Sequence, residues 1–532
     1  MSDDEADLIV VGGGSAGCAL AARLAEATRL SILLLEAGRS DRHPFTRIPA
    51  ATGAAIFNPH FNWMHQIEPD ASRNGAIDMW PAGRCLGGGS AINGMMFIRG
   101  HAHDFDGWAQ GGCLGWAWTD VLPYFRRLER NSRGGDRWRG GDGPVSVADA
   151  RDDHPLIERW IEAAVQAGIA RSADLNGAQQ EGVDRVQASQ CRGWRHPTSK
   201  AYIWSRPRSN LRLRLHTEIV RVVFEGSRAV AVEWIRGGVR GTTRARAGVV
   251  LSAGALATPK ILMHSGIGPQ AELARHGLAC HIDASEVGRN LQEHPGIRWQ
   301  APVNVPTLNM GLGPLGGLRA FWRLLSKGEG PLTLPIGQAQ ALVRSSVQSR
   351  SPDVQIIMSA LAIDVTDRGG WPASAARVDG AIGAMHPCAR GYLRLRSADP
   401  ADKPQIHHQL LGDERDVATL IRGGRLQRRI LSQPAFKRFL AGPGSLPDIA
   451  ASDDEWRDHV RQSAFPMYHP VGTCRMGSDE RAVLDPRLHV RGVERLWVAD
   501  ASIMPSLPGA NTNAAAIMIG ERAADLIRED CQ

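Results

Sequence analysis

The sequence predicts an α/β fold in which a doubly wound, dinucleotide-binding domain is interrupted by a second domain. Near the start of the chain, an apolar strand at 8–11 leads through a glycine-rich turn and a helix into a second strand at 32–35. Further buried strands are expected far along the chain, at 249–252 and 496–499, and a helix of small residues closes it. At 532 residues the chain is too long for one ordinary core, so two domains are the default.

The glycine-rich turn carries Gly12, Gly14 and Gly17. The first glycine allows a tight turn, the second lets the backbone approach a pyrophosphate, and the third lets the helix pack closely on the strand. Glu36 ends the second strand, where a carboxylate can accept hydrogen bonds from ribose hydroxyls. This combination predicts dinucleotide binding, with a purely structural βαβ turn as the alternative. Glu36 disfavours NADP, but the motif does not separate FAD from NAD.

The segments between the two ends are expected to alternate between the two domains. The expected elements, in chain order, are a Gly-rich loop at 75–110, an amphipathic helix at 154–168, strands at 211–224 and 229–236, a helix begun by Thr258 and Pro259, strands at 353–360 and 391–396, and a long helix around 413–432. The stretch 301–347, rich in Gly, Pro and Leu, is expected to be irregular.

Composition excludes several classes of function. The net charge is +7, but the basic residues are spread along the chain without interleaved aromatics, which argues against nucleic-acid binding. No run of 18 apolar residues exists, so no transmembrane segment is predicted. The eight cysteines show neither a C-x-x-C pair nor zinc spacing, which predicts free thiols and no metal site. The acidic start, residues 1–5, leaves no room for a signal peptide and predicts a cytoplasmic protein, with peripheral contact to the inner membrane left open.

The C-terminal region places a base and an amide close to a helix start. His469 stands between Tyr468 and Pro470, and Asn513 follows a glycine-containing turn and opens the final helix. A histidine titrates near neutral pH and can take a hydroxyl proton, and an asparagine amide can steady the resulting negative charge. A lone histidine is more often a buried structural residue, and we interpret His294 and His386, which also precede prolines, in that way.

Several ordered blocks resemble the glucose-methanol-choline (GMC) oxidoreductases. The block 83–100 (GRCLGGGSAINGMMFIRG) is similar to the first signature of that family, and the block 254–268 (GALATPKILMHSGIG) to the second. The block 287–295 (VGRNLQEHP) and the segments around His469 and Asn513 also match. The resemblance extends from about residue 7 to 527, and is nearest to bacterial choline-dehydrogenase-like and sorbose-dehydrogenase-like alcohol dehydrogenases.

The resemblance implies a particular division of the chain. A discontinuous, Rossmann-type FAD-binding domain would comprise residues 1–155, 206–299 and 466–532, the last part carrying the catalytic residues. An α+β substrate domain with an antiparallel sheet would comprise residues 156–205 and 300–465. The motifs do not specify an oligomeric state.

The resemblance also assigns site residues. His469 and Asn513 match the catalytic pair of the family. The residues that would hold FAD are Gly12, Gly14, Gly17, Glu36, Arg84, Gly88, Ser90, Asn93, Val220, Asp500, Ala501, Asn511 and Thr512. Family members with covalently bound flavin have a histidine just before the asparagine of the first signature. Ile92 occupies that position, which predicts non-covalent FAD.

The implied activity is oxidation of an alcohol to an aldehyde or ketone, with His469 as base, hydride transfer to the flavin and a quinone-like electron acceptor. Choline-type members carry a glutamate where Gln338 falls, so a neutral primary or sugar-type alcohol is expected rather than choline. Alternatives are an alcohol oxidase that uses O2, a flavin-containing hydroxynitrile lyase and a photodecarboxylase. A non-catalytic flavin protein would leave the pairing of His469 with Asn513 unexplained.

Overall fold

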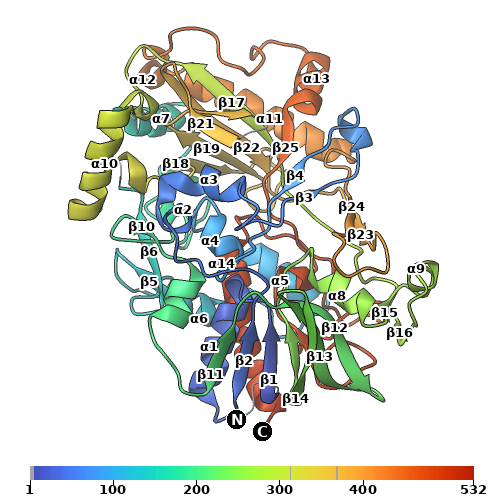
Figure 1. The fold of residues 1–532 in the computed structure, drawn as a ribbon. Coiled ribbons are helices and arrows are strands. Elements are labelled where there is room, and N and C mark those ends of the chain that lie inside the picture. The colour runs from blue at the N-terminus through green and yellow to red at the C-terminus, as the bar shows by residue number, and fades with distance from the viewer. Residues whose placement is uncertain (1–4, 152–153, 312, 367–368) are drawn as a thin grey trace.

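A computed structural model describes residues 5–151, 154–311, 313–366 and 369–532. Figure 1 shows two sheets at opposite ends of the molecule, with helices α4, α5 and the start of α14 between them. Met1–Asp4, on which the predicted location partly rests, lie outside the described residues.

The lower sheet in Figure 1 contains the predicted nucleotide-binding strands. Its path is β11 (Leu211–Arg214), β2 (Ile32–Leu35), β1 (Glu5–Val11), β14 (Val239–Leu251), β13 (Arg228–Arg236) and β12 (Glu218–Glu225), with β26 (Leu496–Val498) beside β14. β11, β2, β1, the end of β14 and β26 run parallel, whereas β12, β13 and the start of β14 form an antiparallel meander. The consecutive residues 8–11 are all buried, as a parallel strand covered on both faces requires.

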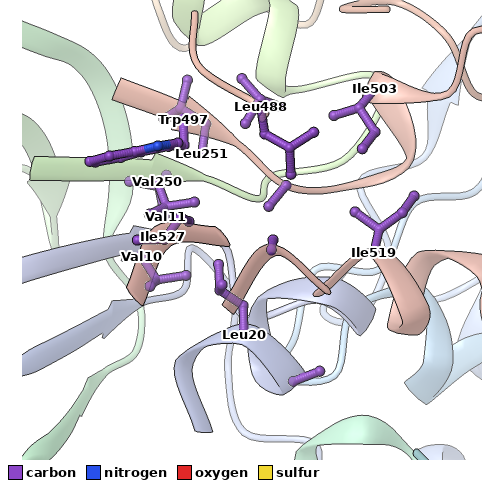
Figure 2. Packing of buried hydrophobic residues seen from close by; sticks show 14 of the residues in the cluster. Val10, Val11, Leu20, Val250, Leu251, Leu488, Trp497, Ile503, Ile519 and Ile527 are labelled. Carbon is purple, nitrogen blue, oxygen red and sulfur yellow. The ribbon is translucent and has the colours of Figure 1, made fainter. Parts of the chain in front are cut away.

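Two helices from opposite ends of the chain pack together against this sheet. They are α1 (Ser15–Ala27) and α14 (Asn513–Asp530), and the small residues of α14 let them approach closely. A Cβ added at Gly520 would lie 2.3 Å from the carbonyl oxygen of Ala16. Figure 2 shows Leu20 and Ile519 on these helices in the same buried cluster as the strand residues Val10 and Val250.

The upper sheet is entirely antiparallel. Its order is β25 (Ala464–Pro466), β17 (Pro295–Pro302), β22 (Arg377–Ala384), β19 (Val354–Ser359), β18 (Ala339–Val343) and β7 (Gly182–Arg185). Helices α7 (Pro155–Gln166) and α11 (Glu414–Leu431) bury their apolar faces against it. α11 begins at the Asp413 cap and has arginines in its last turn, which suits the helix dipole. The predicted fold class, an α/β nucleotide-binding layer joined to a domain with an antiparallel sheet, is confirmed.

The remaining elements connect or cover these two sheets. The helices are α2 (Pro44–Arg47), α3 (Thr52–Ile56), α4 (Gly89–Ile92), α5 (Ala102–Gln110), α6 (Trp118–Leu128), α8 (Thr258–His264), α9 (Gln270–Arg275), α10 (Pro314–Lys327), α12 (Pro434–Lys437) and α13 (Asp453–Ser463). The short strands are β3 (His65–Gln66), β4 (Met79–Trp80), β5 (Glu129–Asn131), β6 (Val145–Asp149), β8 (Gln187–Ala188), β9 (Gln190–Cys191), β10 (Trp194–Arg195), β15 (Ile267–Gly268), β16 (Ile282–Asp283), β20 (Ile363–Thr366), β21 (Gly369–Pro372), β23 (Tyr392–Arg394) and β24 (Gln405–His407). Within the described ranges, no helix is both long and apolar enough to cross a membrane.

The structure differs from the sequence-based expectation in the stretch 301–347. This stretch is not irregular, because it contains helix α10 and the central strand β18. All five residues of β18 are buried, so the strand lacks the alternation that marks a half-exposed strand in a sequence. Strand β17 already joins the upper sheet at Pro295, so the predicted boundary at residue 299 falls inside a strand. The division of the chain into five segments otherwise stays a prediction.

Candidate functional site

The glycine-rich turn lies between the end of β1 and the start of α1, at the carboxyl end of the parallel strands. Gly12 has φ +100°, and a Cβ there would lie 2.4 Å from the carbonyl oxygen of Ser252. A Cβ at Gly17 would lie 2.0 Å from the carbonyl oxygen of Gly12. Both positions therefore require glycine for the packing of the protein itself.

Gly14 is different, because the protein leaves room beside it. A Cβ there would meet nothing closer than the carbonyl oxygen of Ser252 at 3.9 Å. Gly14 is also the N-cap of α1, and no side chain caps this helix start. Free N–H groups at a helix N-terminus attract phosphate, so the space beside Gly14 fits the pyrophosphate of a dinucleotide.

Glu36 stabilises this turn from the end of β2. Its two carboxylate oxygens accept hydrogen bonds from the backbone N–H of Gly13 (2.9 Å) and of Gly38 (2.7 Å). Burial, opposed by these hydrogen bonds, raises the pKa of Glu36 to about 7. A carboxylate accepts about four hydrogen bonds, so Glu36 keeps capacity for a ribose hydroxyl.

Val220 lies in β12, and Arg84 approaches the start of the same strand at Glu218. Val220 stands at a register shift between β12 and β13, and such a bulge leaves the main chain of the extra residue outside the ladder. Arg84 stacks on Trp63, with its guanidinium carbon 4.5 Å from the ring centroid, and lies 4.0 Å from Glu218.

The first signature block folds directly over the glycine-rich turn. Gly88 has φ +50°, and a Cβ there would lie 2.7 Å from the Cα of Gly14. The hydroxyl of Ser90 lies 2.9 Å from that of Thr198. Asn93 accepts hydrogen bonds from the buried Arg195, at 2.6 Å to its carbonyl and 2.8 Å to its side chain. Thr198 and Arg195 were not predicted, because they lie about a hundred residues away and outside the signature blocks.

Asp500 follows β26 and joins it to the segment around Gly254. Its side chain accepts hydrogen bonds from the backbone N–H of Gly254 (2.8 Å) and the hydroxyl of Thr258 (2.6 Å). It also accepts from the backbone N–H of Ser502, and so caps the short helical turn that begins at Ala501. The structure therefore brings residues 12–17, 88, 254 and 500 together, and leaves the cofactor roles of these residues as proposals.

His469 follows strand β25 at the junction of the two sheets. The preceding residue, Tyr468, has φ +67°, a region that non-glycine residues rarely adopt, and such residues concentrate at functional sites. The backbone N–H of His469 donates to both carboxylate oxygens of Glu293, at 2.8 Å each. The buried side chain of Glu293 thus fixes the backbone of the turn that carries His469.

A chain of hydrogen bonds determines which nitrogen of His469 carries hydrogen. Nε2 of His294 lies 3.1 Å from the carbonyl oxygen of Met385, which can only accept, so this nitrogen donates. Burial, and then the neighbouring His469, lower the pKa of His294 well below its usual value, so His294 is neutral and its Nδ1 has no hydrogen. Nδ1 of His469, 2.9 Å from Nδ1 of His294, must therefore donate. The Nε2 of His469 therefore carries no hydrogen, and its lone pair can accept a hydrogen bond.

The residue that contacts this lone pair is Asn511, not Asn513. The amide nitrogen of Asn511 lies 3.2 Å from Nε2 of His469, while its amide oxygen accepts a hydrogen bond from Gln355. Asn513 instead donates to the hydroxyl of Ser15, at 2.8 Å, at the start of α1. Thr512, the N-cap of α14, separates the two asparagines.

His294 and His386, interpreted from the sequence as structural residues, both contact the site. His294 orients His469, as described above. His386 lies 2.8 Å from one oxygen of Asp104, whose other oxygen accepts from the backbone N–H of Gly509. Burial alone would lower the pKa of His386, but the hydrogen bond and charge of Asp104 outweigh it and raise this pKa. The pair clamps the loop that carries Asn511.

The groups around Asn511 are neutral amides. Gln355 donates to the side chain of Gln340 at 2.7 Å and to Asn511 at 3.2 Å. Gln338, singled out from the sequence as the position of a missing counter-charge, instead accepts a hydrogen bond from the backbone N–H of Ala360 at 2.6 Å. Gln338 therefore has a structural role in the upper sheet.

Comparisons with known proteins place the chain in one family. The family described as GMC oxidoreductase matches residues 6–296 and, with its C-terminal part, residues 387–520. The mitochondrial choline dehydrogenase of Mus musculus is 38% identical over 99% of this chain and 90% of that protein. The oxygen-dependent choline dehydrogenase of Brucella ovis is 37% identical over 98% and 95%.

Solved structures show the same fold. Pyridoxine 4-oxidase from Mesorbium loti superimposes with a TM-score of 0.88 at 29% identity, covering 98% of each chain. A formate oxidase of Aspergillus oryzae has a TM-score of 0.90 over 100% of this chain and 99% of that one, and its 23% identity supports the fold alone.

Proposed function

Because the chain belongs to the GMC oxidoreductase family, whose choline dehydrogenases are FAD-dependent enzymes that act on CH–OH groups, we propose that His469 is the base in the FAD-dependent oxidation of a neutral alcohol. The observation that carries the proposal is that Nε2 of His469 carries no hydrogen and accepts, a tautomer set by the hydrogen bonds through His294 to Met385. Bound FAD supplies the two-electron oxidant that takes the hydride from the alcohol carbon.

The proposed proton path uses only groups of the chain. The alcohol hydroxyl takes the place of the Asn511 amide at Nε2 of His469 and gives its proton to this nitrogen. The displaced amide of Asn511 then donates to the alcohol oxygen and stabilises its developing negative charge. The resulting imidazolium keeps its Nδ1–H on His294. Glu36, Asp500 and the glycine-rich turn hold the cofactor, and Ile92 supports non-covalent binding.

A neutral substrate is favoured by the amides Gln340, Gln355 and Asn511. The nearby acids are already bonded, Glu293 to the backbone of His469 and Asp104 to Gly509 and His386. A quaternary ammonium such as choline needs an accessible negative charge or an aromatic face. A primary or sugar-type alcohol needs only hydrogen-bonding amides.

The test is anaerobic visible absorbance of the purified holoenzyme during addition of a panel of neutral alcohols and of choline. Bleaching of the oxidised-flavin band by a neutral alcohol, and not by choline, is the expected result. A protein bleached by choline alone would overturn the substrate class, and one bleached by no alcohol would favour the lyase or photodecarboxylase alternatives. Readmitting air separates an oxidase from a dehydrogenase. A quinone-like acceptor, a cytoplasmic location and peripheral contact with the inner membrane stay predictions.

The two asparagines provide a direct test of the site. Asn511→Ala should slow flavin reduction by about 10² or more, since it removes the donor to the alcohol oxygen, and should leave FAD bound. Asn513→Ala should mainly weaken FAD binding, because its amide contacts Ser15 at the start of α1. Stopped-flow reduction and the ratio of flavin to protein absorbance measure the two effects. The reverse pattern would restore the pairing of His469 with Asn513 predicted from the sequence.

The pH profile should reflect the burial of the base. Burial lowers the pKa of His469 from 6.5 to about 4, so the ring is neutral and competent down to well below pH 6.5. Flavin reduction should stay constant from neutral pH to below 6.5 and fall only toward pH 4. The folded protein loses stability over the same window, since the unfolded chain binds a proton that the buried ring does not. The rates are therefore measured by pH-jump stopped flow, and an acid limb centred at or above 6.5 would contradict the assignment.

A further inference from the structure

Helix α10 carries an unusual set of exposed apolar side chains. It lies at the outer edge of the molecule, at the left of the upper sheet in Figure 1. Five large residues along it are between 38% and 85% exposed: Leu315, Leu318, Phe321, Trp322 and Leu325. Soluble proteins rarely expose a contiguous apolar patch of this kind without a binding function.

The apolar and the charged side chains of α10 lie on different sides of the helix. With about 100° between successive residues, the five apolar residues fall within one arc of roughly 120°. Ala320 and Leu324, on the opposite side, are buried and fasten the helix to the protein. Arg319, Arg323 and Lys327 form a line of exposed cations along one flank, which begins beside the apolar face at Arg319 and ends beside the buried face at Lys327.

The charges on α10 have one sign only. The helix contains no Asp or Glu, so its three cations have no counter-charge on their own element. A broad apolar face that includes Trp and Phe, bordered by Arg and Lys, is the pattern of helices that lie in the surface of a bilayer. At 14 residues the helix is about 21 Å long, which suits a position in the plane of the surface.

We propose that α10 binds the surface of an anionic lipid bilayer. The five apolar side chains enter the boundary between headgroups and acyl chains, and Arg319 and Arg323, the cations nearest to this face, contact lipid phosphates, while Lys327 adds to the positive charge of the helix. A second copy of the chain is a poorer occupant, because a two-fold contact places the same surface of both copies together and brings the three cations of one helix near those of the other. Membrane binding by α10 is independent of which alcohol His469 acts on.

The experiment is vesicle flotation of the full-length holoenzyme, with phosphatidylcholine vesicles and with an equal mixture of phosphatidylcholine and phosphatidylglycerol. The wild type should float with the mixed vesicles, and less so at high salt because salt screens the cations. Leu318→Glu/Trp322→Glu should reduce binding by about tenfold or more. Arg319→Gln/Arg323→Gln/Lys327→Gln should remove the preference for anionic vesicles.

The matched control is Leu114→Glu, which changes a leucine that is also strongly exposed (77%) but lies outside α10. It should float like the wild type. Oxidation of a soluble alcohol with a soluble dye acceptor should be unchanged in every variant, which confirms that each one is folded. Failure of the wild type to float, or undiminished flotation of Leu318→Glu/Trp322→Glu, would overturn the proposal. A wild-type dimer that fails to float and becomes monomeric in Leu318→Glu/Trp322→Glu would show instead that a second copy covers α10.

Discussion

Replacing His469 with alanine should leave FAD bound but slow alcohol-dependent flavin reduction by about 10² or more. The surrounding hydrogen bonds leave Nε2 of His469 without a hydrogen and in contact with the Asn511 amide, and alanine offers no group to take the hydroxyl proton. The nearby His294 cannot substitute, because its Nε2 donates to the Met385 carbonyl and its Nδ1 faces His469. Anaerobic stopped-flow absorbance measures the rate, and the flavin-to-protein absorbance ratio measures retention of the cofactor.

His294→Leu is the control that separates the base from the residue that positions it. His469 remains in this variant, but nothing accepts its Nδ1–H. A fraction of the protein molecules therefore carries the hydrogen of His469 on Nε2 instead of Nδ1. Reduction should therefore slow by less than in His469→Ala, and exchange of the histidine tautomers should appear in nitrogen NMR spectra. Unchanged reduction in His469→Ala would remove the proposed base. Unchanged tautomer populations in His294→Leu would remove the positioning role.

Gly17→Ala should destabilise the protein and abolish FAD retention. The added Cβ would lie 2.0 Å from the carbonyl oxygen of Gly12. The backbone fixes the positions of both atoms, so α1 must move away from β1. Alanine in a helix is otherwise about 1 kcal/mol more favourable than glycine, whereas overpacking costs about 1–3 kcal/mol, so the clash decides the sign. Thermal unfolding of the FAD-stripped protein should show a lower Tm than the wild type.

Gly14→Ala is the matched control in the same turn. Its Cβ meets nothing within 3.9 Å and its φ of −81° suits alanine, so the Tm of the FAD-stripped protein should change little. FAD affinity should still fall, because the methyl group occupies the space beside the helix N-terminus. Native FAD affinity in Gly14→Ala would mean that the pyrophosphate does not pass this residue. An unchanged Tm in Gly17→Ala would mean that the contact between α1 and β1 yields easily.

Local patterns predicted the nucleotide-binding half of the site well. The strand, turn and helix around Gly12–Gly17 appear where the sequence places them, and so do β26 and α14 near the other end. These elements depend on contacts within a few residues, on the backbone freedom of glycine and on continuous burial. The prediction that residues 301–347 are irregular was wrong in two places. Strand β18 forms only through pairing with β7 and β19, whereas helix α10 has a local amphipathic pattern and was nevertheless not predicted.

By itself the sequence determined the family, the order of the elements and the residue types at the site. The tertiary structure alone decided which of them touch: His469 meets His294, 175 residues away, and Asn511 rather than Asn513. The reason is the direction in which each side chain points, since residues two positions apart in a turn point to different sides. His386 and Asp104 hold the backbone at Gly509 and so orient the loop that carries Asn511, and the positive φ of Tyr468 orients His469. Likewise, the amphipathic pattern of α10 is present in its sequence, but only the tertiary structure shows that no other element among the described residues covers its apolar face.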